Sequence, residues 1–185
     1  METPRPLRAD ARRNRARILD AAVGVFAERG ASASTEEVAA RAGVAIGTVF
    51  RHFPTKPDLL KAVVMSLQDG LVADVDALAG APDASALRLF CARVLAVGAD
   101  NRAVFARLAE TGTRVHVGDA LSRLRPAIDR LVERARSAGG VRADLVTEEL
   151  IALLSALCQE AMAEGWGEEF RERTLALLFE GLAGG

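Results

Sequence analysis

The chain has 185 residues and a mass of 19.6 kDa, which suits one domain of ordinary size or a small module joined to a larger one. Half of its residues are apolar but only 4% are aromatic, and Tyr is absent, so we expect a core of Ala, Leu and Val packed between helices. The net charge of −1 argues against a nucleic-acid partner when taken alone. The charge is divided unevenly, however, because residues 1–66 carry +4 and residues 67–185 carry −5.

Several classes of protein are excluded by the same inspection. No apolar run reaches the ~18 residues that a membrane helix needs. Residues 1–17 are charged and lack the apolar core of a signal peptide. Two cysteines, Cys91 and Cys158, are too few for a disulfide framework or a metal cluster, and we expect both to be buried thiols. The sequence therefore predicts a cytoplasmic protein with no membrane partner, no metal and no cofactor.

The N-terminal segment is predicted to be a flexible basic arm, residues 1–9, followed by a helix that begins near Asp10. An apolar stripe at helical spacing indicates the buried face of this helix, and Gly30 ends it. Four arginines crowd its first turns, where the helix dipole disfavours cations. They indicate either an external anion or a solvated face, and the sequence leaves both open. The stripe is Ile18, Ala22, Val25 and Phe26, and the arginines are Arg12, Arg13, Arg15 and Arg17.

Two short helices are predicted next. Ser34 and Glu37 have the spacing of a capping box, so the first starts at Thr35, and Gly43 closes it. The second covers residues 46–52 and ends before Pro54. A further helix starts after Thr55 and runs to about residue 78.

The remainder predicts helices over residues 85–99, 101–110, 119–138, 147–164 and 168–182, with Pro126 kinking or dividing the third of these. No strand-like alternation persists. The predicted fold is therefore all-α, with about nine helices. We expect a DNA-binding helix-turn-helix domain over residues 10–55 and a helical regulatory and dimerisation domain over residues 56–185.

The functional assignment of the first domain depends on one string of residues. Two short helices joined by a tight turn, behind a longer helix, form a helix-turn-helix. Residues 44–56, VAIGTVFRHFPTK, closely resemble the recognition segment of TetR-type (tetracycline-repressor-like) transcriptional regulators, and the flanks match over residues 12–64. The resemblance implies an all-helical homodimer that binds a near-palindromic operator in double-stranded DNA, and most simply a repressor that a small effector releases.

Contacts to DNA are expected from the second short helix and its surroundings. Its first turn should lie at the base edges of the major groove, and Arg51 is the side chain able to bind guanine in a bidentate manner. The resemblance assigns phosphate contacts to Thr35, Thr48, His52 and Lys56. The full predicted set is Arg5, Arg8, Arg12, Thr35, Ala45, Ile46, Gly47, Thr48, Phe50, Arg51, His52 and Lys56.

Three positions of this helix raise questions. Ala45 stands where the family commonly has Ser or Thr, so the helix lacks its usual side-chain cap. Phe50 stands where the family commonly has Tyr, so it can only pack against the sugar–phosphate backbone. Gly47 lowers helix propensity by up to ~1 kcal/mol relative to Ala, which either close approach to DNA or an internal packing need would explain.

The acidic second domain is expected to dimerise and to hold the effector. Its last two helices are apolar over more than one stripe, so each should face a core and a partner. The predicted interface is Leu150, Leu154, Leu157, Leu175, Leu178, Phe179 and Leu182, and the predicted pocket for a mainly hydrophobic effector is Phe90, Arg93, Leu108, Thr111, Arg114 and His116.

Two alternatives remain at this stage. One is a regulator of the same type without a small effector, acting as an activator or through a protein partner. The other is an enzyme with an incidental helix-turn-helix. Two distant histidines, and the absence of a phosphate loop or a nucleophile elbow, disfavour the enzyme.

Overall fold

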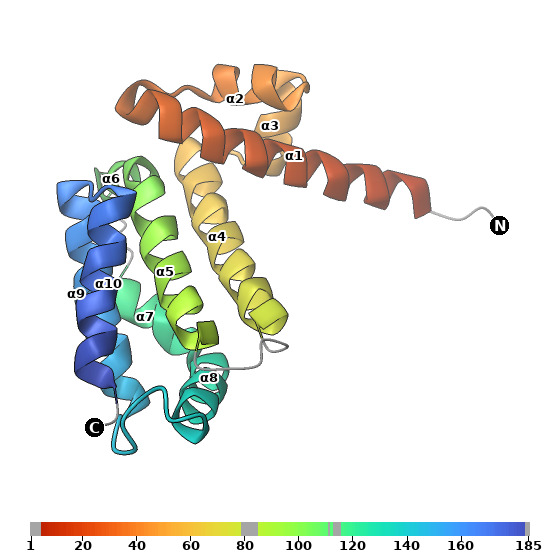
Figure 1. Ribbon diagram of the computed structural model, residues 1–185. Helices are drawn as coiled ribbons and strands as arrows, with labels where there is room; N and C mark the ends of the chain where they lie inside the picture. The colour runs from red at the N-terminus through yellow and green to blue at the C-terminus, as the bar shows by residue number, and fades with distance from the viewer. Residues whose placement is uncertain (1–4, 79–84, 111, 113–115, 184–185) are drawn as a thin grey trace. The chain divides into compact units, whose positions relative to one another are not determined.

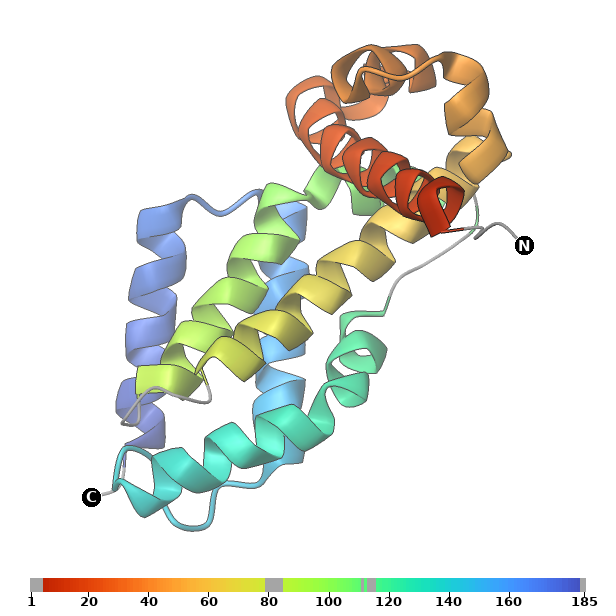
Figure 2. The same ribbon diagram turned by 90° about the vertical axis from the view of Figure 1, so that its right-hand side faces the viewer.

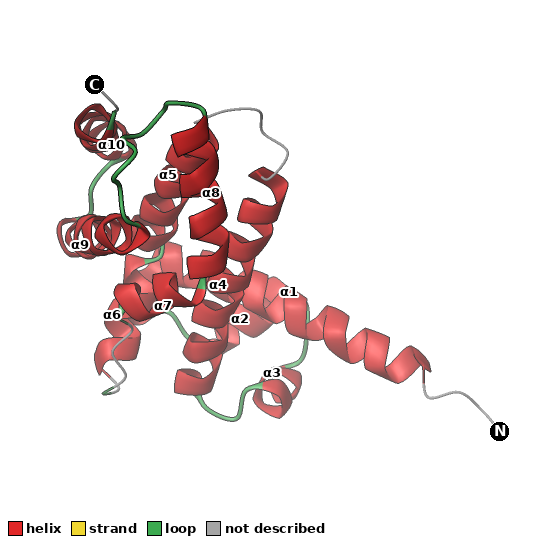
Figure 3. Ribbon diagram, turned by 90° about the horizontal axis from the view of Figure 1, so that it is seen from below, coloured by secondary structure: helices red, strands yellow, loops and turns green. Residues whose placement is uncertain are grey.

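The computed structural model describes residues 5–78, 85–110, 112 and 116–183, apart from the side chains of residues 5–9, 31 and 76. Every regular element within these ranges is a helix, which confirms the all-α prediction (Figures 1 and 3). The α-helices are α1 (Arg5–Arg29), α2 (Thr35–Ala42), α3 (Ile46–His52), α4 (Lys56–Leu78), α5 (Ser85–Asp100), α6 (Arg102–Glu110), α7 (Val117–Arg123), α8 (Arg125–Ser137), α9 (Thr147–Glu164) and α10 (Glu168–Leu182), and a short 3-10 turn covers Gly30–Ser32.

The chain divides into two compact units, each with its own core. The head unit consists of Met1–Ser66 together with Ala103–Arg114, and the body unit of Leu67–Arg102 together with Val115–Gly185. Helix α4 thus contributes its first half to the head unit and its second half to the body unit, and most of α6 belongs to the head unit.

The core of the head unit forms where α1 packs along α2, and α2 packs on α3 (Figure 2). The stripe predicted on α1 is fully buried there, since Ile18, Ala22, Val25 and Phe26 are at most 2% exposed. Apolar side chains from the other elements of the head unit are buried as well, namely Val38, Ala39, Val49, Phe53, Leu59, Leu60, Val63, Val104 and Leu108.

The body unit is organised around α5, which packs against α8, α9 and α10, while α7 packs on α9. Its core is aliphatic, as the composition predicts, with Phe90 the one fully buried aromatic side chain within the described residues of the body unit. The thiols of Cys91 and Cys158 are both buried in it, as expected.

Two helix boundaries bear on the sequence predictions. Pro126 lies in the first turn of α8, and the predicted 119–138 helix is divided at Leu124 into α7 and α8, because Pro cannot continue a helix but is tolerated at its start. Helix α1 begins at Arg5, five residues before the predicted start, so residues 5–9 are helical.

Candidate nucleic-acid interface

Local hydrogen bonds fix both ends of α2, and those at its C-terminus begin the turn that leads to α3. The Ser34 hydroxyl accepts from the Glu37 N–H at 3.2 Å, and the Glu37 carboxylate accepts from the Ser34 N–H at 2.9 Å, which confirms the capping box. At the other end Gly43 adopts a left-handed conformation with φ of +63° and donates to carbonyls of α2. The chain then enters α3 directly.

Helix α3 has one buried face and one exposed face. Val49 is fully buried, and Phe53, directly after the helix, is 4% exposed, so these two side chains attach α3 to the head unit. The rest of the helix surface is exposed and consists of residues predicted to contact DNA, namely Ala45, Ile46, Gly47, Phe50 and Arg51, with Thr48 and His52 half-buried at its margins.

Gly47 stands in open space. A Cβ built on it would meet no atom within 4 Å, so no neighbour within the described residues requires a glycine here. This excludes the internal packing need that the sequence left as one of two explanations. Of the two explanations that the sequence offers for this residue, only close approach of DNA is compatible with the open space around it.

The N-terminus of α3 carries no side-chain cap, as Ala45 predicts. At this end of the helix the Thr48 N–H donates to the Ala45 carbonyl at 2.8 Å, a hydrogen bond between backbone groups. The N–H groups of a first helical turn have no partner within the helix and can donate to an anion such as a phosphate.

The arginines of α1 have partners within the head unit. Arg15 places its guanidinium 5.4 Å from the centroid of the Phe53 ring, and Arg17 donates to the Gly43 carbonyl at 3.4 Å. Arg13 pairs with Asp10. Since α1 begins at Arg5, these arginines lie beyond the first turn, and the dipole argument for an external anion does not apply to them. Arg12 is exposed, and the side chains of Arg5 and Arg8 lie outside the described residues.

Lys56 begins α4 and is held in a defined position. Its ammonium donates to the Ala33 carbonyl and lies 5.6 Å from the centroid of the Phe26 ring. Partial burial, followed by the charge of Arg107 on α6, lowers the pKa of Lys56. An ammonium has three N–H donors, so Lys56 can bind a phosphate while keeping its bond to Ala33.

The remaining predicted phosphate contacts lie close to capping groups. Thr35 is half-buried at the start of α2, and its hydroxyl donates to Glu36 at 3.4 Å. His52 ends α3 with its ring 6.2 Å from that of Phe53. Thr55 forms a reciprocal cap with Asp58, which fixes the start of α4 as predicted.

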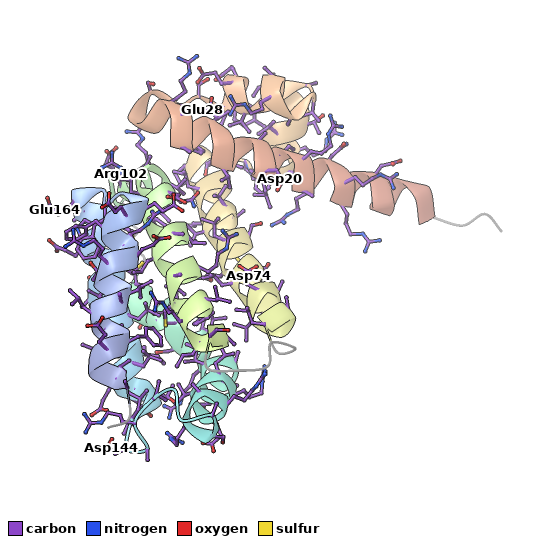
Figure 4. The ribbon with its side chains drawn as sticks, viewed as in Figure 1. Asp20, Glu28, Asp74, Arg102, Asp144 and Glu164 are labelled. Carbon is purple, nitrogen blue, oxygen red and sulfur yellow. The ribbon has the colours of Figure 1, made fainter. Side chains whose placement is uncertain are left out.

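One brace in the head unit escaped the sequence analysis. Arg41 of α2 donates two hydrogen bonds to Glu28 of α1, which is labelled in Figure 4, and these bonds lower the pKa of Glu28. The Arg41 side chain crosses Gly24, where an added Cβ would lie 2.8 Å from the guanidinium. Two features of the sequence could have indicated this contact, namely the opposite charges of Glu28 and Arg41 on neighbouring helices and Gly24 in a helix interior.

Two family models match this chain over most of its length. The model described as bacterial regulatory proteins, tetR family, matches residues 18–63, which include the exposed face of α3. A second model, described as a transcriptional regulator SbtR-like, C-terminal domain, matches residues 82–184. The chain belongs to the TetR family of bacterial transcriptional regulators. It is thereby a DNA-binding protein, as the head unit indicates.

Individual relatives agree with this assignment. A TetR transcription regulatory protein from Mycobacterium vanbaalenii is 34% identical with a TM-score of 0.77, over 96% of this chain and 99% of that one. The TetR transcriptional regulator SCO0520 from Streptomyces coelicolor is 30% identical with a TM-score of 0.75, over 92% and 98%. The HTH-type transcriptional repressor Rv3405c from Mycobacterium tuberculosis is 54% identical over 50 residues, 26% of this chain and 27% of that protein. Alignments with such curated relatives span only a quarter to a half of their lengths.

The last two helices of this TetR-family regulator expose different residues from those expected at an interface. Leu150, Leu154, Leu175 and Leu182 are buried in the core of their own subunit. Leu157, Leu178 and Phe179 are half-buried against that core. The exposed apolar side chains on these helices are instead Leu153 at 44%, Phe170 at 54% and Leu177 at 70%. Because apolar residues occur on several sides of each helix, the sequence does not reveal which side packs into the core.

The residues proposed for an effector pocket are dispersed. Phe90 is fully buried in the body core, and Leu108 is buried in the head unit. Arg93 is exposed and donates to Asp74 at 2.8 Å, and it lines an open groove of about 270 Å³ between α5 and α10. His116 is exposed before α7, whereas Thr111 and Arg114 lie outside the described residues.

In the described part of the chain, no group of three or more His, Cys, Asp or Glu side chains is arranged to hold a metal ion. None of its helices combines the length and the hydropathy that crossing a bilayer requires.

Proposed function

We propose that this chain is a homodimeric transcriptional repressor that a small, mainly hydrophobic effector releases from a near-palindromic operator. The observation that carries the DNA-binding part of the proposal is the division of α3 into a buried and an exposed face. Val49 and Phe53 hold the helix in the head unit, and the face with Gly47 and Arg51 is left open. This is the geometry that a recognition helix needs to enter the major groove.

The proposal of a homodimer is supported by the outer faces of α9 and α10. Both helices pack on α5 and form one side of the body unit (Figures 1 and 3). Phe170 and Leu177 lie seven residues apart on α10, hence on one face, and both are more than half exposed. Apolar exposure of this kind marks an interaction surface, and a twofold copy of the same surface would place two heads on successive major grooves.

The proposal of an effector is supported by polar atoms buried in the body core without a partner. Ser155 of α9 is 7% exposed, and its hydroxyl has no hydrogen-bond partner among the described residues. It faces Gly118 of α7, where an added Cβ would lie 3.5 Å from it. A buried hydroxyl of this kind requires a partner, which a polar group on an effector or a buried water molecule would supply. The relative Rv3405c is named as a repressor, which favours repression over activation.

The deciding experiment is selection of bound sequences from a random DNA pool, followed by titration of the selected duplex. We expect a near-palindrome whose affinity falls about 10³–10⁵-fold between ~50 and ~200 mM salt if six to ten phosphates are neutralised. Arg51→Ala and Lys56→Ala should each weaken binding at least tenfold. Lys61→Ala, which removes an exposed cation from α4 outside the predicted contact set, should change it less than threefold. Operator binding that survives both Arg51→Ala and Lys56→Ala would show that the head has been assigned wrongly.

The effector part has its own test. Apolar compounds are screened for a rise in melting temperature and for release of the selected duplex. Ser155→Ala should weaken the response to any effector that carries a polar group while leaving DNA binding unchanged. A complete screen without a compound that does both would favour a regulator that responds to a protein partner instead.

A further inference from the structure

We infer that the recognition helix reads thymine through the methyl group, with Ile46 as the residue that makes the contact. The inference rests on the proposed placement of α3 in the major groove. It goes further by naming the base and the chemistry of its recognition.

The exposed face of α3 carries a small apolar ridge. Ile46 and Phe50 are four residues apart, hence neighbours on one face, and they are 37% and 43% exposed. Val49, three residues after Ile46 and of the same apolar character, is fully buried beside them. The ridge therefore lies at the margin of the core of the head unit and leaves more than a third of each side chain open to solvent.

The backbone beside the ridge is unobstructed. Gly47 follows Ile46 directly, and a Cβ at that position would meet nothing within 4 Å. Ala45 precedes Ile46 with the smallest side chain that has a Cβ, and it is exposed. A base edge can therefore approach the first turn of α3 closely enough to touch the Ile46 side chain.

The chemistry of the groove selects the base. Thymine alone among the four bases presents a methyl group in the major groove, whereas the other edges present hydrogen-bond donors and acceptors. An isoleucine held against such an edge would leave those groups without water and without a partner, which is unfavourable. Thymine offers the apolar surface that Ile46 can cover, and Arg51, which lies on the Gly47 side of the helix, can bind guanine nearby.

The test uses the selected duplex with single methyl groups removed from the DNA. Each thymine is replaced in turn by deoxyuridine, which removes only the C5 methyl group. We expect one or two thymines per half-site at which this replacement lowers the affinity of the wild-type chain about threefold to fivefold. Ile46→Ala should lower affinity by a similar factor and should lose most of its sensitivity to deoxyuridine at those positions.

Two controls separate this inference from the proposed function. Met65→Ala removes another exposed apolar side chain of the head unit, 59% exposed on α4, and should retain both affinity and sensitivity to deoxyuridine. Replacing the sensitive thymine by 5-methylcytosine should weaken binding less than unmethylated cytosine does. Tight, selective binding with no thymine sensitive to deoxyuridine would overturn the inference and leave the DNA-binding proposal standing, whereas absence of selective binding would overturn both.

Discussion

The Sγ atom of Cys158 on α9 occupies the space that a Cβ on Gly98 of α5 would need. Met162, one turn further along α9, lies against the same position, with its Cγ 3.3 Å from that Cβ. Helices α5 and α9 share the largest contact in the body unit, so the absence of a side chain at residue 98 sets how closely its two central helices approach.

Gly98→Ala should therefore destabilise the protein. Overpacking a filled core costs about 1–3 kcal/mol, and the better helix propensity of Ala offsets up to ~1 kcal/mol of that. Chemical denaturation should show a net loss in the free energy of unfolding. Gly70→Ala, at a helical glycine of α4 with nothing within 4 Å, is the matched control and should raise stability by ~0.5–1 kcal/mol. Adding Cys158→Ala should reduce the cost of Gly98→Ala, and strictly additive effects would contradict the contact.

Gly47→Ala separates stability from DNA binding. Because the added methyl meets nothing within 4 Å, helix propensity should raise the melting temperature, by an amount that corresponds to about 0.5–1 kcal/mol. The same methyl should lower operator affinity, because it stands between the helix and the base edges. A variant that is more stable and binds DNA as well as the wild type would show that the first turn of α3 does not approach the bases.

The two thiols should be unreactive in the folded protein. Burial raises the pKa of Cys91 to about 12 and that of Cys158 to about 11. At pH 8 the folded protein should react with a thiol reagent at least ~100-fold more slowly than the urea-unfolded chain, since the reactive thiolate falls tenfold per pKa unit. Rapid labelling of the native protein would show that the body opens locally.

The raised pKa values of Cys91 and Cys158 also make the stability of the protein depend on pH. The unfolded chain loses each thiol proton near pH 9, whereas the folded protein keeps it to about pH 11 or 12. The stabilising contribution is therefore complete below pH 9, and the free energy of unfolding falls by up to ~1.4 kcal/mol per pH unit per thiol above it. Cys158→Ala should reduce this slope between pH 9 and 11.

Leu177→Glu should disrupt the proposed dimer without unfolding the subunit. Leu177 is 70% exposed, so a carboxylate there stays solvated in the monomer but would be buried in an interface. Light scattering should detect a monomer, and affinity for the palindrome should fall by ~10²-fold or more because the two heads no longer act together. Leu89→Glu, at a leucine of α5 that is 52% exposed, should remain dimeric. A dimeric Leu177→Glu variant would place the interface elsewhere.

Local signals in the sequence predicted local structure well. The capping box of Ser34 and Glu37, the left-handed Gly43 and the break before Pro126 all lie where the sequence places them. Each depends on residues within four positions of one another. The start of α1 was placed too late because the segment with Arg5 and Pro6 looks like an arm, yet Pro is compatible with the first turn of a helix.

Contacts between distant residues could not be predicted in the same way. Arg15 and Arg17 looked like a surface cluster, but they contact Phe53 and Gly43, which are 38 and 26 positions away. Leu175 is buried and Leu177 is exposed, and the sequence could not predict this difference because periodicity does not distinguish the side of an apolar helix that packs into the body core from the side left open.

Four non-covalent side-chain contacts connect the elements of the head unit, namely Arg15 to Phe53, Arg17 to Gly43, Arg41 to Glu28, and Lys56 to Ala33. Arg15 connects α1 to the residue after α3, Arg17 connects α1 to the turn before α3, and Arg41 connects α2 to α1. Lys56 connects the start of α4 to the segment before α2. A head unit connected in this way presents one fixed surface for contact with DNA. In the proposed dimer, an effector would alter the spacing of the two heads but not the shape of either one, so a DNA fragment with a single half-site should not respond to it. Under that proposal, effector binding would affect only those operators that both heads must occupy at once.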